Sequence, residues 1–164
     1  MNLELSPANL DDPADAAAVR ELIDAYARDP MGGGEALHEG VLEAVVPRLR
    51  EHPTTRIWLA RDAGQPVGAA ICFLGFTTFE ARRLLNIHDL MVAASHRRRG
   101  VGRALLEAVE AGARSLDCCR VTLEVRQDNE PARALYADFG LRGYVLGGEE
   151  HPMYFITKEI RAEG

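Results

Sequence analysis

Residues 90–106 run Leu-Met-Val-Ala-Ala-Ser-His-Arg-Arg-Arg-Gly-Val-Gly-Arg-Ala-Leu-Leu, and this stretch decides the fold. An apolar strand pattern passes through a short basic loop into a helical pattern whose first turn holds Gly100 and Gly102. The free N–H groups and positive dipole end of a helix N-terminus favour a phosphate, and glycine lets the main chain approach it closely. Positive charge comes from Arg97, Arg98, Arg99 and Arg103. The stretch therefore predicts a pyrophosphate-binding loop.

Two familiar phosphate motifs do not fit this loop. The dinucleotide fingerprint requires a third glycine where this chain has Leu105, and the P-loop requires a Gly-Lys-Ser/Thr sequence that is absent. Taken alone, the arginine run also fits a solvated helix start, and His96–Arg99 fits a nucleic-acid contact. The formal net charge of -6 argues against broad nucleic-acid binding.

A second informative pattern is Asn129-x-x-Ala132-x-x-Leu135-Tyr136, followed by Phe139-Gly140 and then Tyr144. The apolar positions recur at i, i+3, i+4 and i+7, which predicts a short helix with one buried stripe. Gly140 suits a left-handed C-cap for that helix. By periodicity alone, Tyr136 fits a core tyrosine with its hydroxyl satisfied.

Together the two patterns resemble the GCN5-related N-acetyltransferase (GNAT) family. Arg97-x-x-Gly100-x-Gly102 is similar to the family's (Gln/Arg)-x-x-Gly-x-(Gly/Ala) element, and Asn129–Tyr136 is similar to its later motif. The resemblance is strong from Leu84 to Tyr144 and weak before Thr55. It implies an α/β fold with a mixed, mostly antiparallel sheet flanked by helices on both faces. It also implies that residues 1–164 form a single domain.

The resemblance further implies that acetyl-CoA is the cosubstrate. The strand ending near Val92 is expected to splay from its neighbour at Cys119–Gln127, so that main-chain groups of Leu90–Val92 pair with the pantetheine amides. Tyr136 would protonate the departing thiolate. The full set of implied cofactor-binding residues is Leu90, Met91, Val92, Arg97, Arg98, Arg99, Gly100, Val101, Gly102, Arg103, Asn129, Ala132 and Tyr136.

The group that accepts the proton of the attacking amine is less clearly marked. In polyamine and diamine acetyltransferases of the family, a glutamate implicated as base looks equivalent to His88, which makes His88 the catalytic candidate here. Many other members carry their glutamate nearer Asn86, which is an amide in this chain. Glu124 is a reserve candidate, and a hydrogen-bonded structural histidine remains the alternative for His88.

Strand alternation predicts how His88 and Asp89 are oriented. Successive side chains of a strand point to opposite faces. His88 is therefore expected to share its face with Leu90 and Val92. Asp89 is expected to point the other way and to fix the strand or a neighbouring loop.

The remaining elements follow from periodicity and from turn residues. We expect a first strand at Met1–Ser6, then a helix capped by Asp11 or Asp12 that buries Val19, Leu22, Ile23 and Tyr26 and stops at Pro30. We expect later helices at Glu35–Glu51 (kinked or divided by Pro47), Gly100–Leu116 and Asn129–Phe139. The predicted strands are Thr55–Arg61, Pro66–Phe76, a central Leu84–Ala93, Cys119–Gln127, Leu141–Gly147 and Met153–Ile160.

Composition sets the remaining expectations. The 164 residues, 47% hydrophobic and 27% charged, are typical of one ordinary globular domain. Cys72, Cys118 and Cys119 form neither a disulfide framework nor a metal-ligand spacing, so we expect structural cysteines and no metal. No signal peptide or transmembrane run is visible, which predicts a cytoplasmic protein without a membrane partner.

The family resemblance implies an N-acetyltransferase that moves an acetyl group from acetyl-CoA to a primary amine by direct transfer in a ternary complex. The acceptor is a small molecule, polyamine-like or otherwise, or a peptide, and its contacts are expected from Asp29–Glu43 and Thr77–Leu84. The alternative is a sensor or interaction module that binds acetyl-CoA without turnover. Tyr136 favours the enzyme, because a sensor needs no proton donor. The sequence leaves open a homodimer and a preference for another acyl-CoA.

Overall fold

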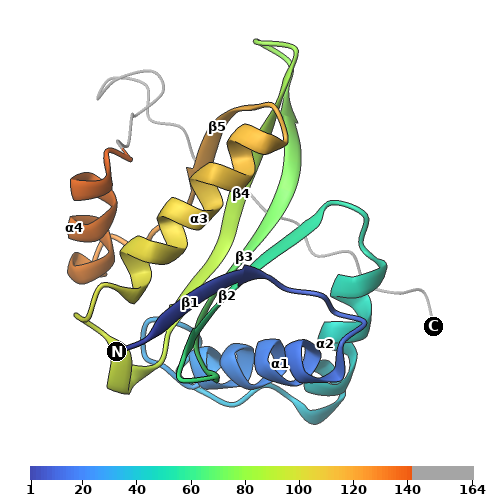
Figure 1. Cartoon of the computed structure of the whole chain (residues 1–164), viewed down its shortest axis with the longest axis vertical. Helices are drawn as coiled ribbons and strands as arrows, with labels where there is room; N and C mark the ends of the chain where they lie inside the picture. The colour runs from blue at the N-terminus through green and yellow to red at the C-terminus, as the bar shows by residue number, and fades with distance from the viewer. Residues whose placement is uncertain (142–164) are drawn as a thin grey trace.

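The computed structural model describes residues 1–141, which form one five-stranded sheet with helices on both faces (Figure 1). The strands are β1 (Leu3–Pro7), β2 (Thr55–Asp62), β3 (Gln65–Thr77), β4 (Arg82–Val92) and β5 (Cys118–Leu123). They lie in sequence order across the sheet. The pairs β1–β2, β2–β3 and β3–β4 are antiparallel, and the pair β4–β5 is parallel. The predicted mixed, mostly antiparallel sheet is confirmed.

The helices are α1 (Pro13–Ala27), α2 (Glu39–Glu51), α3 (Val101–Ser115) and α4 (Glu130–Phe139), with a short 3₁₀ turn at Ala94–His96. Side-chain alternation along the strands divides the core into two layers. One layer packs α3 and α4 on the sheet and holds Trp58, Ala70, Leu85, Ile87, Leu105 and Val109. The other packs α1 and α2 and holds Val19, Leu22, Leu59, Ala69, Ile71 and Met91. Helices on both faces are therefore confirmed.

Several local predictions are also confirmed. Asp12 caps α1, and its carboxylate accepts a hydrogen bond from Ala14 N–H at 2.8 Å. The predicted helix at Asn129–Phe139 is confirmed as α4, and Asn129, whose capping role the sequence analysis did not predict, accepts a hydrogen bond from Ala132 N–H at 3.2 Å. Gly140 closes α4 with φ of 91°, the left-handed conformation that glycine adopts without strain.

Most element boundaries shift by a residue or two from the sequence prediction, and two differ by more. The second helix begins at Glu39, not Glu35, because Gly33 N–H and Glu35 N–H donate to Ala27 O and fold this segment back on the end of α1. That helix then continues through Pro47 as one element. β5 ends at Leu123 instead of Gln127, and Asn129 N–H donates to Arg126 O in the turn that follows. The last two predicted strands, Leu141–Gly147 and Met153–Ile160, lie outside the described residues, as does Tyr144. Only Leu141 is described, and it is not in a strand.

A bulge in β4 overturns the predicted orientation of two side chains. Asp89 pairs with Ile71 and Ile87 pairs with Cys72, so His88 is an extra residue with no partner on β3. Opposite residues of an antiparallel pair share a face, and a bulge resets the alternation. Asp89 therefore lies on the α1 face with Ile71.

His88 lies on that same face, because its ring meets the ring of Phe73 edge-on at 5.5 Å and Phe73 packs on the α1 layer. Leu90 and Val92 pack on the α3 layer instead. The predictions that His88 and Asp89 oppose each other, and that His88 shares a face with Leu90 and Val92, are wrong.

Gly112 of α3 lies against the indole of Trp58, and a Cβ at this position would overlap the six-membered ring of the indole. We expect Gly112→Ala to lower stability by a net of about 1–2 kcal/mol, because overpacking outweighs the gain of about 1 kcal/mol in helix propensity. Thermal unfolding should show a Tm lower by roughly 2–8 °C. In a Trp58→Phe background the same substitution should be neutral or stabilising. A raised Tm in the wild-type background would contradict this packing.

Candidate active site

The parallel ladder between β4 and β5 stops before β4 ends. The last pair is Ile87 with Leu123, while β4 continues to Val92 paired with β3 alone among the described strands. Ala93 N–H donates to Val67 O, across β3, at 2.9 Å. Because main-chain groups alternate along a strand, those of Leu90 and Val92 face away from β3, whereas those of Met91 face it. The sequence prediction that these strands separate beside Leu90–Val92 agrees with this pairing.

The N-terminus of α3 lies directly beyond this open edge. Gly100 is its N-cap, with φ of 87° and no side-chain cap. The first main-chain bond of the helix runs from Ala104 N–H to Gly100 O, so the N–H groups of Val101–Arg103 have no partner within the helix. Such donors, at the positive end of a helix, suit an anion.

The four arginines of the loop have different roles. Arg97 donates to Asp29 Oδ2 at 2.5 Å and to Val92 O at 3.2 Å, so it links the loop after α1 to the end of β4. Arg103 forms an ion pair with Asp138 of α4. Arg98 and Arg99 are exposed, and neither pairs with any residue between 1 and 141. Only these two are free to meet an anion without losing an existing partner.

Gly102 has a packing role that the sequence did not indicate. A Cβ there would lie 2.9 Å from Leu135 Cδ2, so glycine at this position lets α4 approach α3. A larger residue at Gly102 would therefore disturb α4 as well as any bound phosphate. The neighbouring Val101 is a core residue, 1% exposed.

Tyr136 of α4 packs against the α3 layer of the core. Burial, with a smaller effect from Tyr26, raises the pKa of Tyr136 to about 12. The phenol therefore keeps its proton at neutral pH and is available as a donor.

The two candidates for the proton acceptor lie at the bulge of β4 and directly after the end of β5. His88 is exposed apart from its contact with Phe73. Glu124 is also exposed, and its carboxylate accepts a hydrogen bond from the Asn86 amide at 3.4 Å. The same amide donates to Thr122 Oγ1 at 3.2 Å. Asn86 and Glu124 thus tie β4 to the end of β5.

Sequence reasoning missed two residues that border this region. Tyr26, which the helical pattern assigned to the core, is only partly buried at the end of α1, and its pKa is raised by burial first and by Asp89 second. Arg126, from the loop after β5, donates to Pro30 O at 3.4 Å and so touches the loop after α1. For Tyr26 the sequence contained one signal of a role near the site. Tyr26 is the last residue of the apolar stripe of its helix and lies next to the loop that was expected to contact the acceptor.

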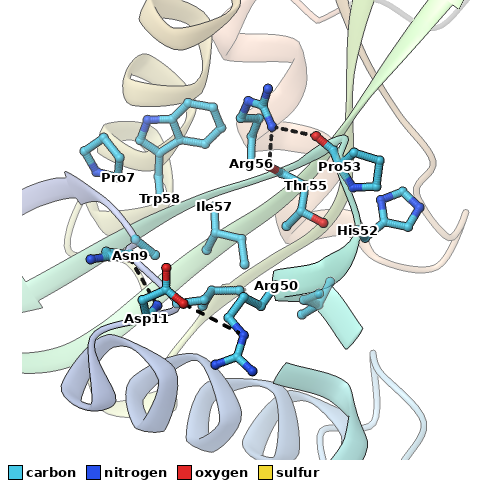
Figure 2. Close-up of a pocket in the computed structure, with 13 residues that line it drawn as sticks. Pro7, Asn9, Asp11, Arg50, His52, Pro53, Thr55, Arg56, Ile57 and Trp58 are labelled. Carbon is cyan, nitrogen blue, oxygen red and sulfur yellow. Dashed lines mark hydrogen bonds and ion pairs between the residues drawn. The ribbon is translucent and has the colours of Figure 1, made fainter. Parts of the chain in front are cut away.

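The hollow in Figure 2 lies elsewhere in the molecule and contains none of the predicted site residues. It measures about 330 Å³ and is bordered by the ends of β1, α2 and the start of β2. There Arg56 donates to Pro53 O and Thr55 O, covering main-chain groups that β1 leaves unpaired (Figure 2). We interpret this hollow as a protected sheet edge.

Comparisons with known proteins show to which family this fold and this open β4 edge belong. The family model "Acetyltransferase (GNAT) family" matches residues 18–141. An uncharacterized N-acetyltransferase of Bacillus subtilis, YhfO, is 30% identical over 77% of this chain and 83% of its own length. A mycothiol acetyltransferase of Clavibacter sepedonicus is 38% identical over 53% of this chain, but over only 29% of its own length.

The structural comparison agrees with the sequence comparisons. The ribosomal-protein-alanine N-acetyltransferase of Brucella melitensis biovar Abortus superposes with a TM-score of 0.72, covering 95% of this chain and 99% of that one at 18% identity. The chain belongs to the GNAT acetyltransferase family, and it is an acyltransferase enzyme.

Residues 1–141 show neither a metal-binding cluster nor a membrane-spanning helix. No group of three His, Cys, Asp or Glu side chains is arranged there to bind a metal ion. None of the described helices is long and apolar enough to cross a membrane.

The ion pair of Asp29 with Arg97 predicts a pH dependence of stability. The hydrogen bond from Arg97, and then that from Met31 N–H, lower the pKa of Asp29 below its usual 3.8. The pair's contribution is therefore complete above pH 3.8 and is lost as pH falls through the lowered pKa. Asp29→Asn should lower Tm at pH 7, and its difference from wild type should shrink below about pH 4. In an Arg97→Gln background, Asp29→Asn should have little further effect on Tm. If the Tm decreases caused by the two substitutions add in full, the pairing of Asp29 with Arg97 is contradicted.

Proposed function

We propose that this enzyme transfers an acetyl group from acetyl-CoA to a primary amine within a ternary complex. The observation that carries the proposal is the juxtaposition of the open β4 edge with the uncapped N-terminus of α3. The main-chain groups of Leu90 and Val92 suit the amides of pantetheine, and the N–H groups of Val101–Arg103 suit the pyrophosphate. Arg98 and Arg99 add charge, Arg97 and Arg103 hold the surrounding elements, and Asn129 caps α4 through the N–H of Ala132.

Binding is the first test of this proposal. Acetyl-CoA at a hundredfold excess over its Kd should stabilise the native state by about 2.7 kcal/mol, which raises Tm by roughly 5–10 °C. The double variant Arg98→Gln/Arg99→Gln should reduce the shift, because these arginines have no other partner within residues 1–141. Arg48→Gln, an exposed arginine of α2, is the matched control and should keep the full shift. A wild-type protein that is not stabilised by millimolar acetyl-CoA contradicts the proposal.

Acetyl-CoA supplies the acetyl group as a thioester. The proposed proton donor to the departing thiolate is the Tyr136 phenol. With a pKa of about 12 this phenol is a weak acid, but burial makes a thiolate a stronger base as well. Burial raises the pKa of the Cys72 thiol of this protein in the same direction. Proton transfer between two groups whose pKa values burial raises together is feasible.

Tyr136→Phe should lower kcat by roughly 10²–10⁴-fold, the usual scale of general acid catalysis. The affinity for CoA should change little, since the ring and its packing remain. Thiol release with one verified amine, together with CoA titration, separates the two effects. Unchanged turnover would return Tyr136 to a structural role in the core.

The proposed acceptor of the amine's proton is His88. An alkylammonium has a pKa near 10.4 and cannot attack a thioester, whereas the reference pKa of histidine is near 6.5, within reach of neutral pH. The exposed ring at the bulge leaves His88 open to a substrate.

The competing function is that of a sensor that binds acetyl-CoA without turnover. It is favoured only if acetyl-CoA binds to the protein and no amine in a broad panel causes the release of CoA thiol.

A further inference from the structure

The connection between β4 and α3 has a backbone shape that its own residues do not favour. Arg98 has φ of 60° and Gly100 has φ of 87°, so both lie in the left-handed region. That region is unfavourable for a residue with a side chain, such as Arg98, and persists only where surrounding contacts hold it. The N–H groups of Val101–Arg103, which lack partners within the helix, follow directly. The shape of the connection therefore decides where those donors point.

Main-chain bonds and Arg97 hold one flank of this connection. Ala93 N–H donates to Val67 O at 2.9 Å, and His96 N–H donates to Ala93 O at 2.8 Å, so the chain leaves β4 in a fixed direction. Arg97 then pairs with Asp29 at 2.5 Å, beside the end of α1. The opposite flank depends on the side chain of His96.

The His96 ring has a polar partner at each of its two nitrogens. Nε2 lies 3.4 Å from Asp62 Oδ2, and both side chains are only 19% exposed. Nδ1 lies 2.9 Å from Ser95 Oγ. A neutral ring can accept from the Ser95 hydroxyl and direct Nε2–H at the carboxylate, while an imidazolium donates at both nitrogens. Both protonation states therefore keep the ring against Asp62.

Asp62 offers this ring an anion that the sheet holds in place. It is the last residue of β2 and pairs with Leu3 of β1. Its Oδ1 accepts a hydrogen bond from Asn2 N–H at 2.7 Å. That bond, and after it the contact with His96 and the positive amino terminus, lower the pKa of Asp62 against the opposing effect of burial, so the group is anionic at pH 7. Figure 1 shows the N-terminus beside the connection from β4 to α3.

The place of the Asp62–His96 pair in the chain matters more than its strength. An isolated ion pair near a surface adds little to the stability of a whole fold. This pair links the end of β2 to a residue two positions before the left-handed Arg98. Its effect should therefore appear mainly in the connection between β4 and α3.

We propose that Asp62 and His96 are positioning residues for the cofactor, which hold this connection in the shape that presents its N–H groups to the pyrophosphate of acetyl-CoA. The inference rests on the proposed function. Asp62 acts through His96, and His96 acts through the main chain that follows it. Without the pair, the connection spends part of its time in other shapes, and the apparent affinity falls with the fraction of molecules that can bind.

The first experiment compares two acetyl donors with His96→Ala. S-Acetylpantetheine carries the same thioester and amides as acetyl-CoA but no pyrophosphate. We expect His96→Ala to raise the KM for acetyl-CoA at least fivefold with kcat within twofold of wild type, and to leave kcat/KM for S-acetylpantetheine within twofold. An equal loss with both donors, or a loss confined to kcat, would overturn the proposal. If the wild type does not use S-acetylpantetheine, the division between KM and kcat with acetyl-CoA decides.

The second experiment tests whether the two side chains act as a pair. Asp62→Asn should raise the KM for acetyl-CoA as His96→Ala does, and the double variant should be no more than twofold worse than the poorer single variant. Full additivity of the two effects would overturn the pairing. Asp117→Asn is the matched control, because Asp117 pairs with Arg82 at the opposite end of β4 and asparagine tolerates its left-handed φ of 55°. This control should keep the wild-type KM.

The third experiment examines the connection in the protein without cofactor. Trypsin cuts after arginine, and Arg97–Arg99 supply three successive sites. His96→Ala and Asp62→Asn should be cut there at least fivefold faster than wild type and the Asp117→Asn control, because cleavage needs a locally opened chain. Mass spectrometry of the fragments assigns the cuts to this connection. Equal rates of cutting in the wild type and His96→Ala would overturn the proposal, and this comparison does not need Asp62→Asn to fold.

Titration with CoA separates this inference from the proposed function. The Kd of CoA should be at least fivefold higher for His96→Ala than for wild type. If that difference is found and no amine releases thiol, the transferase proposal fails and the positioning role stands. If the wild type turns over acetyl-CoA and His96→Ala binds CoA as tightly as wild type, the positioning role fails alone.

Discussion

The hydrogen bonding of β4 is the constraint on which the rest of this structure depends. Every main-chain N–H and C=O group needs a partner, and β4 finds one on β3 along its length but on β5 only as far as Ile87. The groups of Leu90 and Val92 therefore form a short edge within the described sheet. An edge inside a domain is costly unless something covers it. The covering group here is, in part, the Arg97 side chain, which donates to Val92 O.

Close helix packing holds the elements around this edge in place. Trp58 fits against Gly112, and Leu135 fits against Gly102, so α3 lies tightly between the sheet and α4. Arg103 and Asp138 link the same two helices at their surface. On the other face, Arg97 and Asp29 join the loop after α1 to the end of β4. The position of Tyr136 relative to β4 thus depends on contacts made by residues outside the reacting groups.

Patterns local in sequence predicted most of the fold and part of the site. The cap at Asp12, the C-cap at Gly140 and the helical stripes depend on neighbours a few residues away, so a single sequence contains them. The bulge at His88 depends on the register between β4 and β3, which no local pattern encodes. The late start of α2 likewise depends on Ala27 O, and the second role of Gly102 depends on Leu135. The sequence analysis was wrong or incomplete at features that depend on contacts with a segment distant in the sequence.

Several departures from regular local structure lie around the end of β4: the bulge, the left-handed Arg98 with φ of 60°, the uncapped α3 terminus and Asp89, whose carboxylate has no hydrogen-bond or ion-pair partner among residues 1–141. Others lie elsewhere, at the register shift between Ala60 and Arg61 and at the left-handed Ala63, Ala81 and Asp117. Each departs from what local stability favours, and such departures persist when surrounding structure holds them. A regular β4 would have buried one of His88 and Asp89 in the α3 layer, away from the α1 face. The bulge therefore allows one strand to place a carboxylate and an imidazole on the same face, beside main-chain groups of Leu90 and Val92 that no described strand pairs.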